Sequence, residues 1–312
     1  MPYIRCMAAT AIIIPTFNRR ATLLLALSKL HDVLSPDYIV IVVDSGSSDG
    51  TTVAVKEQFP GVILIPGNTS MWWAAAINLG IHKARELGCK YIITYNDDNV
   101  ATPVLFNNLS LAMQKAPESI VSAVCCYLNK PATVFFAGRM RAKKTDRFYY
   151  LDHDVPVASL GTGLRKVDML HGMCTLFPIE IFDKVGLFDE VSFPQAFADD
   201  DLLLRARHAG LSLKVALDAV VLNDRTKTGI NPYDRRLGAT GALQLLISRK
   251  SHFQLAARTR FLWRHRRSAC FFCKTWYSDY LRLFTLVIAR WILPLETFHW
   301  IGIKWGRRLQ RR

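Results

Sequence analysis

The sequence predicts an α/β fold in which a mostly parallel sheet is flanked by helices and followed by a helical extension. Short apolar runs alternate with helical patterns through residues 11–94, which is typical of strand–helix–strand crossovers in a covered sheet. Several of these runs end directly in aspartates. After residue 248, basic and aromatic residues interleave, a pattern that favours amphipathic helices.

Five strands are expected in the first part of the chain, at 11–14, 38–43, 62–65, 91–94 and 120–125. Each is a short run rich in large or β-branched apolar residues, which is the composition of buried strands. Helical patterns separate them at 20–33, 51–59 and 71–87, and a further helix follows Pro103 to about Gln114.

Between 131 and 168 the periodicity weakens, and glycines, basic residues and aromatics are frequent. We expect loops over the active face there. Regular patterning returns with a strand at 173–177, helices at 178–185 and 201–209, and strands at 213–215 and 220–222. Gly210 is expected to terminate the second of these helices.

Composition indicates a globular protein of one large domain or two modest ones. The 312 residues are 51% hydrophobic and 21% charged, which excludes overall disorder. The seven cysteines are odd in number and unevenly placed, so we expect reduced thiols. No charged leader with an apolar stretch opens the sequence, and we therefore expect a cytoplasmic protein.

Aspartates stand at three places where predicted elements meet. Asp44 follows the strand at 38–43, Asp97 and Asp98 follow the strand at 91–94, and 199–201 precede an apolar helix. Open α/β sheets bind ligands at the carboxyl ends of their strands. Two adjacent carboxylates there favour a divalent metal that bridges to a phosphate. The alternative is an acidic turn that caps the next helix.

Four motifs carry a resemblance to the family-2 glycosyltransferases over about residues 11–225. They are Ile14-Pro15-Thr16-Phe17-Asn18, the segment 42–51 around Asp44, Asn96-Asp97-Asp98, and Gly186-Leu187-Phe188-Asp189-Glu190 followed by Asp199-Asp200-Asp201-Leu202 and Arg205. The resemblance implies a GT-A type fold, a nucleotide-sugar donor and inversion at the anomeric carbon. Rhamnose is the donor sugar that it suggests.

The resemblance also implies roles for single residues. Asp98 is expected to ligate Mg²⁺ or Mn²⁺, and Asp199 is expected to act as general base with Asp200 as the competing choice. The residues expected to bind the nucleotide sugar are Pro15, Thr16, Phe17, Asn18, Asp44, Asn78, Asn96 and Asp97. Trp72 and Trp73 precede Asn78 in the same helix, where an indole stacks on a sugar or base or else packs in the core.

Three positions depart from the family pattern. Ala198 stands where many members have Glu, and Asn96 replaces the first carboxylate of the common Asp-x-Asp form. Asn223-Asp224 occupies the region where many relatives place a metal-binding His. We therefore expect Asp224 to substitute as a metal ligand.

The basic charge is concentrated at the end of the sequence. Residues 249–312 hold 15 of the 40 Lys and Arg residues but two of the 25 acidic ones, and so carry +13 of the net +15. We divide the chain into a catalytic domain at 1–248 and a basic, aromatic-rich helical membrane-association region at 249–312. The apolar stretch 283–295 is shorter than the roughly 20 residues that span a bilayer, so we expect helices lying on an anionic membrane.

Two other uses of this region stay open: a helical extension packed on the first domain, and nucleic-acid binding. We expect no nucleic acid, because no recognised nucleic-acid module accompanies the region and the acidic site repels a polyanion.

The predicted function is metal-assisted, inverting transfer of a sugar from a nucleotide-sugar donor to a hydroxyl of a glycan or lipid-linked acceptor. The expected location is the inner face of the membrane, and the expected process is synthesis of a surface polysaccharide. Nucleotidyl transfer on a similar sheet is an alternative, and a non-catalytic basic protein that binds membranes or nucleic acid is another.

Overall fold

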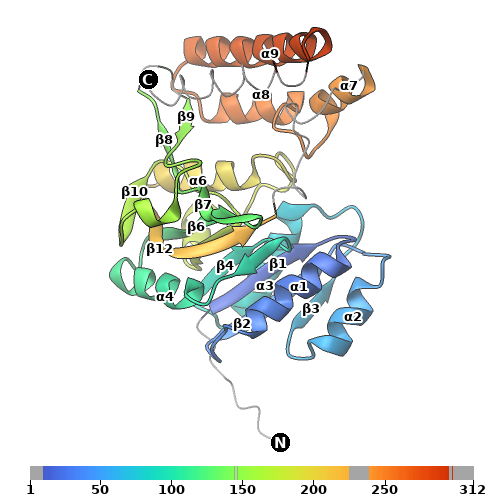
Figure 1. The fold of residues 1–312 in the computed structure, drawn as a ribbon, viewed down its shortest axis with the longest axis vertical. Helices are drawn as coiled ribbons and strands as arrows, with labels where there is room; N and C mark the ends of the chain where they lie inside the picture. The colour runs from blue at the N-terminus through green and yellow to red at the C-terminus, as the bar shows by residue number, and fades with distance from the viewer. Residues whose placement is uncertain (1–9, 144, 146, 225–238, 295–296, 298–312) are drawn as a thin grey trace, which may run out of the picture.

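A computed structural model describes residues 10–143, 145, 147–224, 239–294 and 297. A central sheet of ten strands lies between helices, and helices α7, α8 and α9 are stacked beyond one end of it (Figure 1). The longest path through the sheet has the strand order β10-β12-β6-β11-β4-β1-β2-β3, while β5 pairs with β12 and β7 with β6.

The strands of this sheet are β1 (Thr10–Thr16), β2 (Tyr38–Asp44), β3 (Ile63–Pro66), β4 (Tyr91–Tyr95), β5 (Asn99–Ala101), β6 (Ile120–Tyr127), β7 (Lys130–Phe136), β10 (Leu164–Val167), β11 (Cys174–Pro178) and β12 (Leu213–Asn223). Strands β8 (Arg139–Arg141) and β9 (Phe148–Tyr150) form a separate antiparallel pair. The helices are α1 (Arg20–His31), α2 (Thr51–Gln58), α3 (Trp73–Glu86), α4 (Leu105–Lys115), α5 (Ile181–Val185), α6 (Ala198–His208), α7 (Ala239–Ile247), α8 (Leu255–Arg264) and α9 (Ala269–Ile292), with a 3₁₀ turn η1 (Val157–Ser159).

The predicted α/β fold with a mostly parallel sheet and a C-terminal helical extension is confirmed. Strands β4, β1, β2 and β3 pair in parallel, as do β6 and β12. The expectation of loops between 131 and 168 is wrong, because β7, β8, β9 and β10 lie there. These strands are short and antiparallel, and β7 pairs with β6 through register shifts, so they lack a long regular period. The strands expected at 213–215 and 220–222 are one strand, β12, with an irregularity between Ala216 and Val220.

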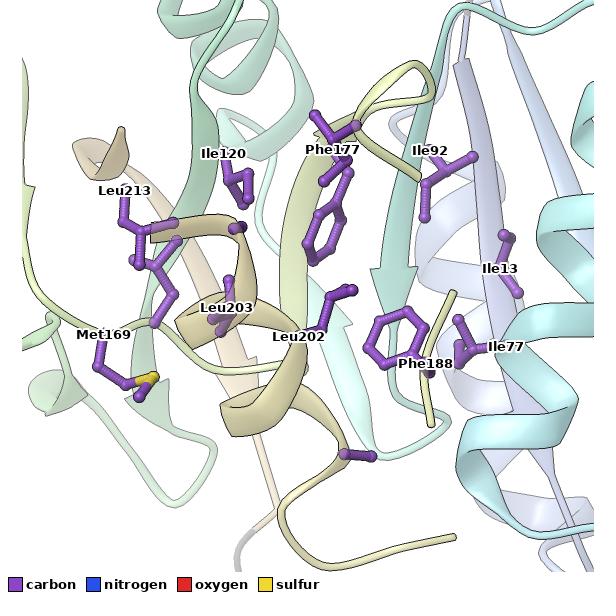
Figure 2. Close-up of a cluster of buried hydrophobic side chains, with 14 of the residues drawn as sticks. Ile13, Ile77, Ile92, Ile120, Met169, Phe177, Phe188, Leu202, Leu203 and Leu213 are labelled. Carbon is purple, nitrogen blue, oxygen red and sulfur yellow. The ribbon is translucent and has the colours of Figure 1, made fainter. Parts of the chain in front are cut away.

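The core lies on both faces of the sheet. Along β1, Ile13 belongs to one buried cluster while Ile12 and Ile14 belong to the other, because successive side chains of a strand point to opposite faces. In the first cluster, Leu202 and Leu203 of α6 extend among side chains from β6 and β11, and Phe188 lies beside Ile77 of α3 (Figure 2). Burial of this kind contributes about 1.5 to 3 kcal/mol for each large side chain, so α6 is fixed firmly to the sheet.

Helix α8 extends this core, whereas α9 packs with α7 in a separate small cluster. Phe261 of α8 stacks on Phe197, just before α6, with ring centroids 4.8 Å apart. Leu283 of α9 packs in a small cluster with Leu245 of α7. The boundary after residue 248 therefore lies between helices that share a cluster, and it stays a prediction. None of the described helices is long and apolar enough to span a membrane.

Gly80 provides a test of how closely α3 packs on β1. A Cβ at position 80 would lie 2.3 Å from Cγ2 of Ile13, and overpacking of this kind costs about 1 to 3 kcal/mol. We expect Gly80→Ala to lower the free energy of unfolding in denaturant titrations, although helix propensity alone favours Ala by about 1 kcal/mol. Gly61→Ala is the control, because a Cβ at position 61 would have no neighbouring atom within 4 Å. Equal midpoints for both variants would contradict the close packing.

Candidate active site

The carboxyl ends of β1, β2 and β4 bring polar residues from three predicted motifs together. Thr16 and Asp44 are register partners at the ends of β1 and β2. The Thr16 hydroxyl donates to Asp97 Oδ2 at 2.9 Å, just beyond β4. All three residues are buried, so this edge of the sheet forms a fixed polar floor.

The turn after β1 and the turn after β2 are hydrogen-bonded to each other. Asp44 Oδ1 accepts from the Ser47 backbone N–H at 2.9 Å, and Oδ2 accepts from the Thr52 hydroxyl at 2.5 Å. Asn18 has a left-handed backbone with φ of 51°, which Asn tolerates better than most residues, and its Oδ1 accepts from the Ser48 N–H at 2.8 Å. Pro15 lies inside β1, whereas Phe17 is 46% exposed. The Phe17 ring is thus the part of the turn that can stack on a ligand.

Arg19 lies between the two aspartates of the central motif. Its Nη1 donates to Asp97 Oδ1 at 2.8 Å and to Asp98 Oδ2 at 3.2 Å. Burial raises the pKa of both carboxyls, and for Asp98 the neighbouring Asp97 raises it further, while Arg19 opposes both shifts. A buried pair of this kind is stable as two anions only with a cation beside it. The sequence interpretation missed Arg19, although it follows directly on the Pro15–Asn18 turn.

Asn223 and Asp224 close the same group from the end of β12. Asn223 Nδ2 donates to Asp98 Oδ1 at 2.8 Å, and the Asp224 backbone N–H donates to the Asp98 carbonyl at 3.1 Å. The structure therefore places both residues beside Asp98, whereas the expected role of Asp224 as a metal ligand stays a prediction. Nothing in the sequence indicated the hydrogen bond from Asn223 to the Asp98 side chain, apart from the position of Asn223 beside Asp224.

The carboxylates at this edge suit a hard divalent cation. Asp97 and Asp98 already share one positive group in Arg19 Nη1. No group of three or more His, Cys, Asp or Glu side chains that could hold a metal is present among the described residues. Mg²⁺ is commonly held by one or two carboxylates together with substrate phosphates. The residues fit that arrangement, in which a donor diphosphate completes the ligand set.

Trp73 and Gly172 connect the central motif to Asp199. Trp73 Nε1 donates to Asn96 Oδ1 at 3.3 Å, and a Cβ at Gly172 would lie 3.0 Å from the Trp73 ring and 3.1 Å from Asp199 Cβ. The Gly172 N–H also donates to Asp199 Oδ2 at 2.8 Å. Asn96 and Asp199 are therefore linked through Trp73 and Gly172.

Asp199 and Asp200 lie in the first turn of α6, not before it as predicted. The Asp199 side chain accepts from two backbone N–H groups, those of Gly172 and Asp200. Burial, and next the charge of Asp200, raise the pKa of Asp199 to about 6, while Arg139 opposes the shift. Asp200 is paired with the Arg139 guanidinium. Of these two carboxylates, Asp199 is thus the one that has no ion-pair partner among the described residues.

The third aspartate of this turn is structural. Asp201 is fully buried and accepts from Arg205 at 2.8 Å, Arg264 at 3.0 Å and His265 at 2.9 Å. Burial raises its pKa, but the hydrogen bond from His265 and the two arginines outweigh that and lower it. Helix α8 therefore holds the turn that carries Asp199 through contacts that sequence spacing does not reveal.

The Asn78 side chain is hydrogen-bonded to the loop before α6. Its Nδ2 donates to the Phe188 carbonyl at 2.9 Å and to Glu190 Oε2 at 2.8 Å, and its Oδ1 accepts from the Phe188 N–H at 3.1 Å. Both polar atoms thus position that loop. Its predicted contact with a nucleotide sugar stays a prediction, and the observed contacts give it a supporting role.

Comparisons with known proteins bear on the family and the fold of the chain. The family model described as Glycosyl transferase family 2 matches residues 11–185. No curated protein sequence matches the chain at a significant level. Two solved structures share the fold. One is GalNAc-T7 with UDP, GalNAc and Mn²⁺, which is 11% identical and has a TM-score of 0.56 over 70% of this chain. The other is the mannosyltransferase PcManGT from Pyrobaculum calidifontis with GDP-Man and Mn²⁺, which is 16% identical and has a TM-score of 0.52 over 97% of this chain. The match covers 44% of GalNAc-T7, less than half of its length, and 83% of PcManGT.

Proposed function

The chain belongs to glycosyl transferase family 2 and has the GT-A type fold, and on that premise we propose that it transfers a sugar from a nucleotide-sugar donor to a hydroxyl of a glycan or lipid-linked acceptor, with inversion at the anomeric carbon. The observation that carries the proposal is the chain of contacts from Asp98 through Asn96 and Trp73 to Asp199. These contacts connect the expected diphosphate site to the expected general base.

The donor lies, in this proposal, along the ends of β1, β2 and β4. Phe17 stacks on the base, and Asp44 holds the turn against which the nucleoside lies. Thr16 and Arg19 fix the orientation of Asp97. Rhamnose is the donor sugar we would test first, because the sequence motifs suggest it.

Asp98 and Asp224, with Asp97 beside them, are the residues that would hold Mg²⁺ or Mn²⁺ together with the donor diphosphate. A metal bound there would offset the negative charge that develops on the leaving diphosphate. GalNAc-T7 and PcManGT were both solved with Mn²⁺, which supports the proposal. Arg19 would then give up part of its contact with the two carboxylates.

Asp199 is the general base in this proposal. A carboxylate with a pKa of about 6 is largely ionised at neutral pH and is still basic enough to take a proton from an attacking hydroxyl. Asp200 is less suited to that role, because its charge is engaged by Arg139. The Gly172 N–H holds the Asp199 carboxylate, and Gly172 also lies close to the Trp73 indole. In this proposal the indole supplies an apolar surface for a sugar ring.

The experiment that tests the function is a screen of purified protein against UDP-, dTDP- and GDP-sugars with Mn²⁺ or Mg²⁺. The readout is slow hydrolytic release of the nucleotide, with and without EDTA. Release of a nucleoside diphosphate from one donor supports glycosyl transfer. Release of pyrophosphate in a parallel incubation of a nucleoside triphosphate with a sugar 1-phosphate would favour the nucleotidyltransferase alternative. If no donor binds, a non-catalytic binding protein becomes the better description.

The exposed face of α9 supports the proposed association with the inner face of an anionic membrane. The apolar side chains exposed along this helix are Tyr277, Leu281, Phe284, Ile288, Trp291 and Ile292. Their spacing of three or four residues places them on one side, while Leu283 on the other side is buried. An apolar stripe on a basic region is the pattern of helices that lie in the headgroup layer.

Phe284→Glu tests this proposal. We expect it to weaken binding to vesicles of phosphatidylcholine and phosphatidylglycerol by about tenfold or more, because insertion of a phenyl ring contributes about 1.5 to 3 kcal/mol. Co-sedimentation measures the bound fraction. Val53→Glu on α2 is the matched control, since Val53 is also exposed but lies outside the stripe. Equal binding of vesicles by both variants would contradict a role for the apolar stripe of α9 in membrane association.

A further inference from the structure

A cavity of about 290 Å³ lies between the β8–β9 pair and helices α6, α8 and α9. Figure 1 shows β8 and β9 extending from the sheet toward α8 and α9, and the cavity is lined from both sides. We call it the arginine cavity, because six arginines line it: Arg139, Arg141, Arg147, Arg258, Arg266 and Arg282. Its volume is near the lower end of the roughly 300 to 1,000 Å³ that is usual for ligand sites.

The charges around the cavity do not balance. Asp200 and Asp279 are the carboxylates among its described lining residues, so six arginines leave an excess of four positive charges, with the histidines neutral. Asp200 is engaged by Arg139, and Asp279 is shared by Arg147 and Arg258. Like charges gathered around a small hollow with protein walls create a strong positive potential. The potential of the described lining therefore favours an anion.

A buried nitrogen atom of the lining points to the same conclusion. Arg139 Nε is buried and has no hydrogen-bond partner within the described part of the protein. The Arg139 guanidinium lies 5.7 Å from the centroid of Phe148, which also lines the cavity. A buried donor without an acceptor is costly. Phosphate oxygens would supply acceptors to a guanidinium in the geometry that arginine favours.

The cavity also adjoins the candidate base. Asp200 is one of its lining residues, and Asp199 is the next residue in the same turn of α6. Arg139 bridges Asp200 and the Leu170 carbonyl, two residues before the glycine that holds Asp199. A group bound in the cavity would thus fix the position of whatever extends from it toward Asp199.

We propose that the arginine cavity binds a phosphate or diphosphate group of the acceptor, so that the acceptor is a phosphate ester whose hydroxyl reaches Asp199. The assignment to an acceptor rests on the proposed function, whereas binding of a phosphate group does not. The cavity is too small for an oligosaccharide, so the remainder of the acceptor lies outside it. A lipid-linked diphosphate and a polyol phosphate share the recognised chemistry and are separated by the test.

Calorimetric titration with geranyl diphosphate and with glycerol 3-phosphate tests the proposal, in EDTA so that no metal assists binding at the donor edge. We expect wild-type protein to bind at least one probe. The double variant Arg266→Gln/Arg282→Gln should bind it at least about tenfold more weakly, because charge-assisted hydrogen bonds are lost. Arg260→Gln is the matched control, since Arg260 is exposed on α8 and does not line the cavity. A preference for geranyl diphosphate would indicate a lipid-linked acceptor, and a preference for glycerol 3-phosphate a polyol phosphate.

Two results would overturn the proposal: no binding of either probe by wild-type protein, or equal binding by the double variant. Donor hydrolysis in the same preparations separates this result from the proposed function, because hydrolysis needs no acceptor. We expect the double variant to hydrolyse donor as wild type does, which also shows that it is folded. Arginine-dependent probe binding without any donor binding would retain the phosphate site but overturn its assignment to an acceptor.

Discussion

Asp199→Asn is expected to lower the rate of sugar transfer to the acceptor by about 10²- to 10⁴-fold, the usual contribution of a general base. The amide keeps the shape of the side chain and one acceptor for the N–H groups of Gly172 and Asp200, but it cannot accept the proton of the attacking hydroxyl. Donor binding should be unchanged, because the described hydrogen bonds of the Asp199 side chain are to Gly172 and Asp200 and not to residues of the donor edge. Transfer assays and donor titrations on the same protein measure the two quantities.

The pH profile gives this prediction a second readout. A base must be deprotonated, so with a pKa of about 6 for Asp199 we expect kcat/KM of the wild type to rise as pH increases through about 6. This rise should be absent from the residual activity of Asp199→Asn. Asp200→Asn removes the negative charge that raises the pKa of Asp199, so it should move the rise to lower pH. Loss of transfer in Asp200→Asn with near-normal transfer in Asp199→Asn would instead identify Asp200 as the base.

Asp98→Asn is expected to reduce metal-dependent transfer by about 10²-fold or more, since charge stabilisation by a metal contributes several kcal/mol. The substitution removes one of the two carboxylates that share Arg19 and retains an oxygen for the bond from Asn223. Binding of Mn²⁺ in the presence of nucleoside diphosphate, followed by electron paramagnetic resonance, should weaken in parallel. EDTA should abolish transfer by the wild type.

Asp32→Asn serves as a control for Asp98→Asn, because Asp32 is an exposed residue in a surface pair with Lys29. Thermal melting excludes a folding defect. Burial already disfavours the charged form of Asp98, so a neutral isostere should not lower the melting temperature. Transfer that is unaffected by EDTA and by Asp98→Asn would contradict the metal proposal and would leave Arg19 as the cation at this site.

Local sequence was sufficient for the main α/β framework. Alternating apolar runs and helical periods predicted the strands and helices from β1 to β6 apart from β5, and again from β11 to β12, although β12 was expected as two strands. Strands buried on both faces have a nearly continuous apolar composition, which makes them visible in this way. The aspartate at the end of β2 and those just beyond β4 were expected at one edge of the sheet, because parallel strands end on the same side. The region 130–167 could not be predicted in this way, since its short strands depend on partners distant in sequence, such as Leu164 with Ala216.

The sequence by itself determined the fold class, the order of the motifs and the presence of acidic residues at the ligand edge, because these depend on periodicity over a few residues. Only the tertiary structure decided how the acidic residues differ from one another. Arg139 pairs with Asp200 across 61 residues of sequence, and His265 holds Asp201 across 64. Asp199 lies in the same helical turn without such a pair, and burial raises its pKa. Long-range packing sets the solvation and the charge partners of a carboxylate, so three consecutive aspartates can perform different tasks.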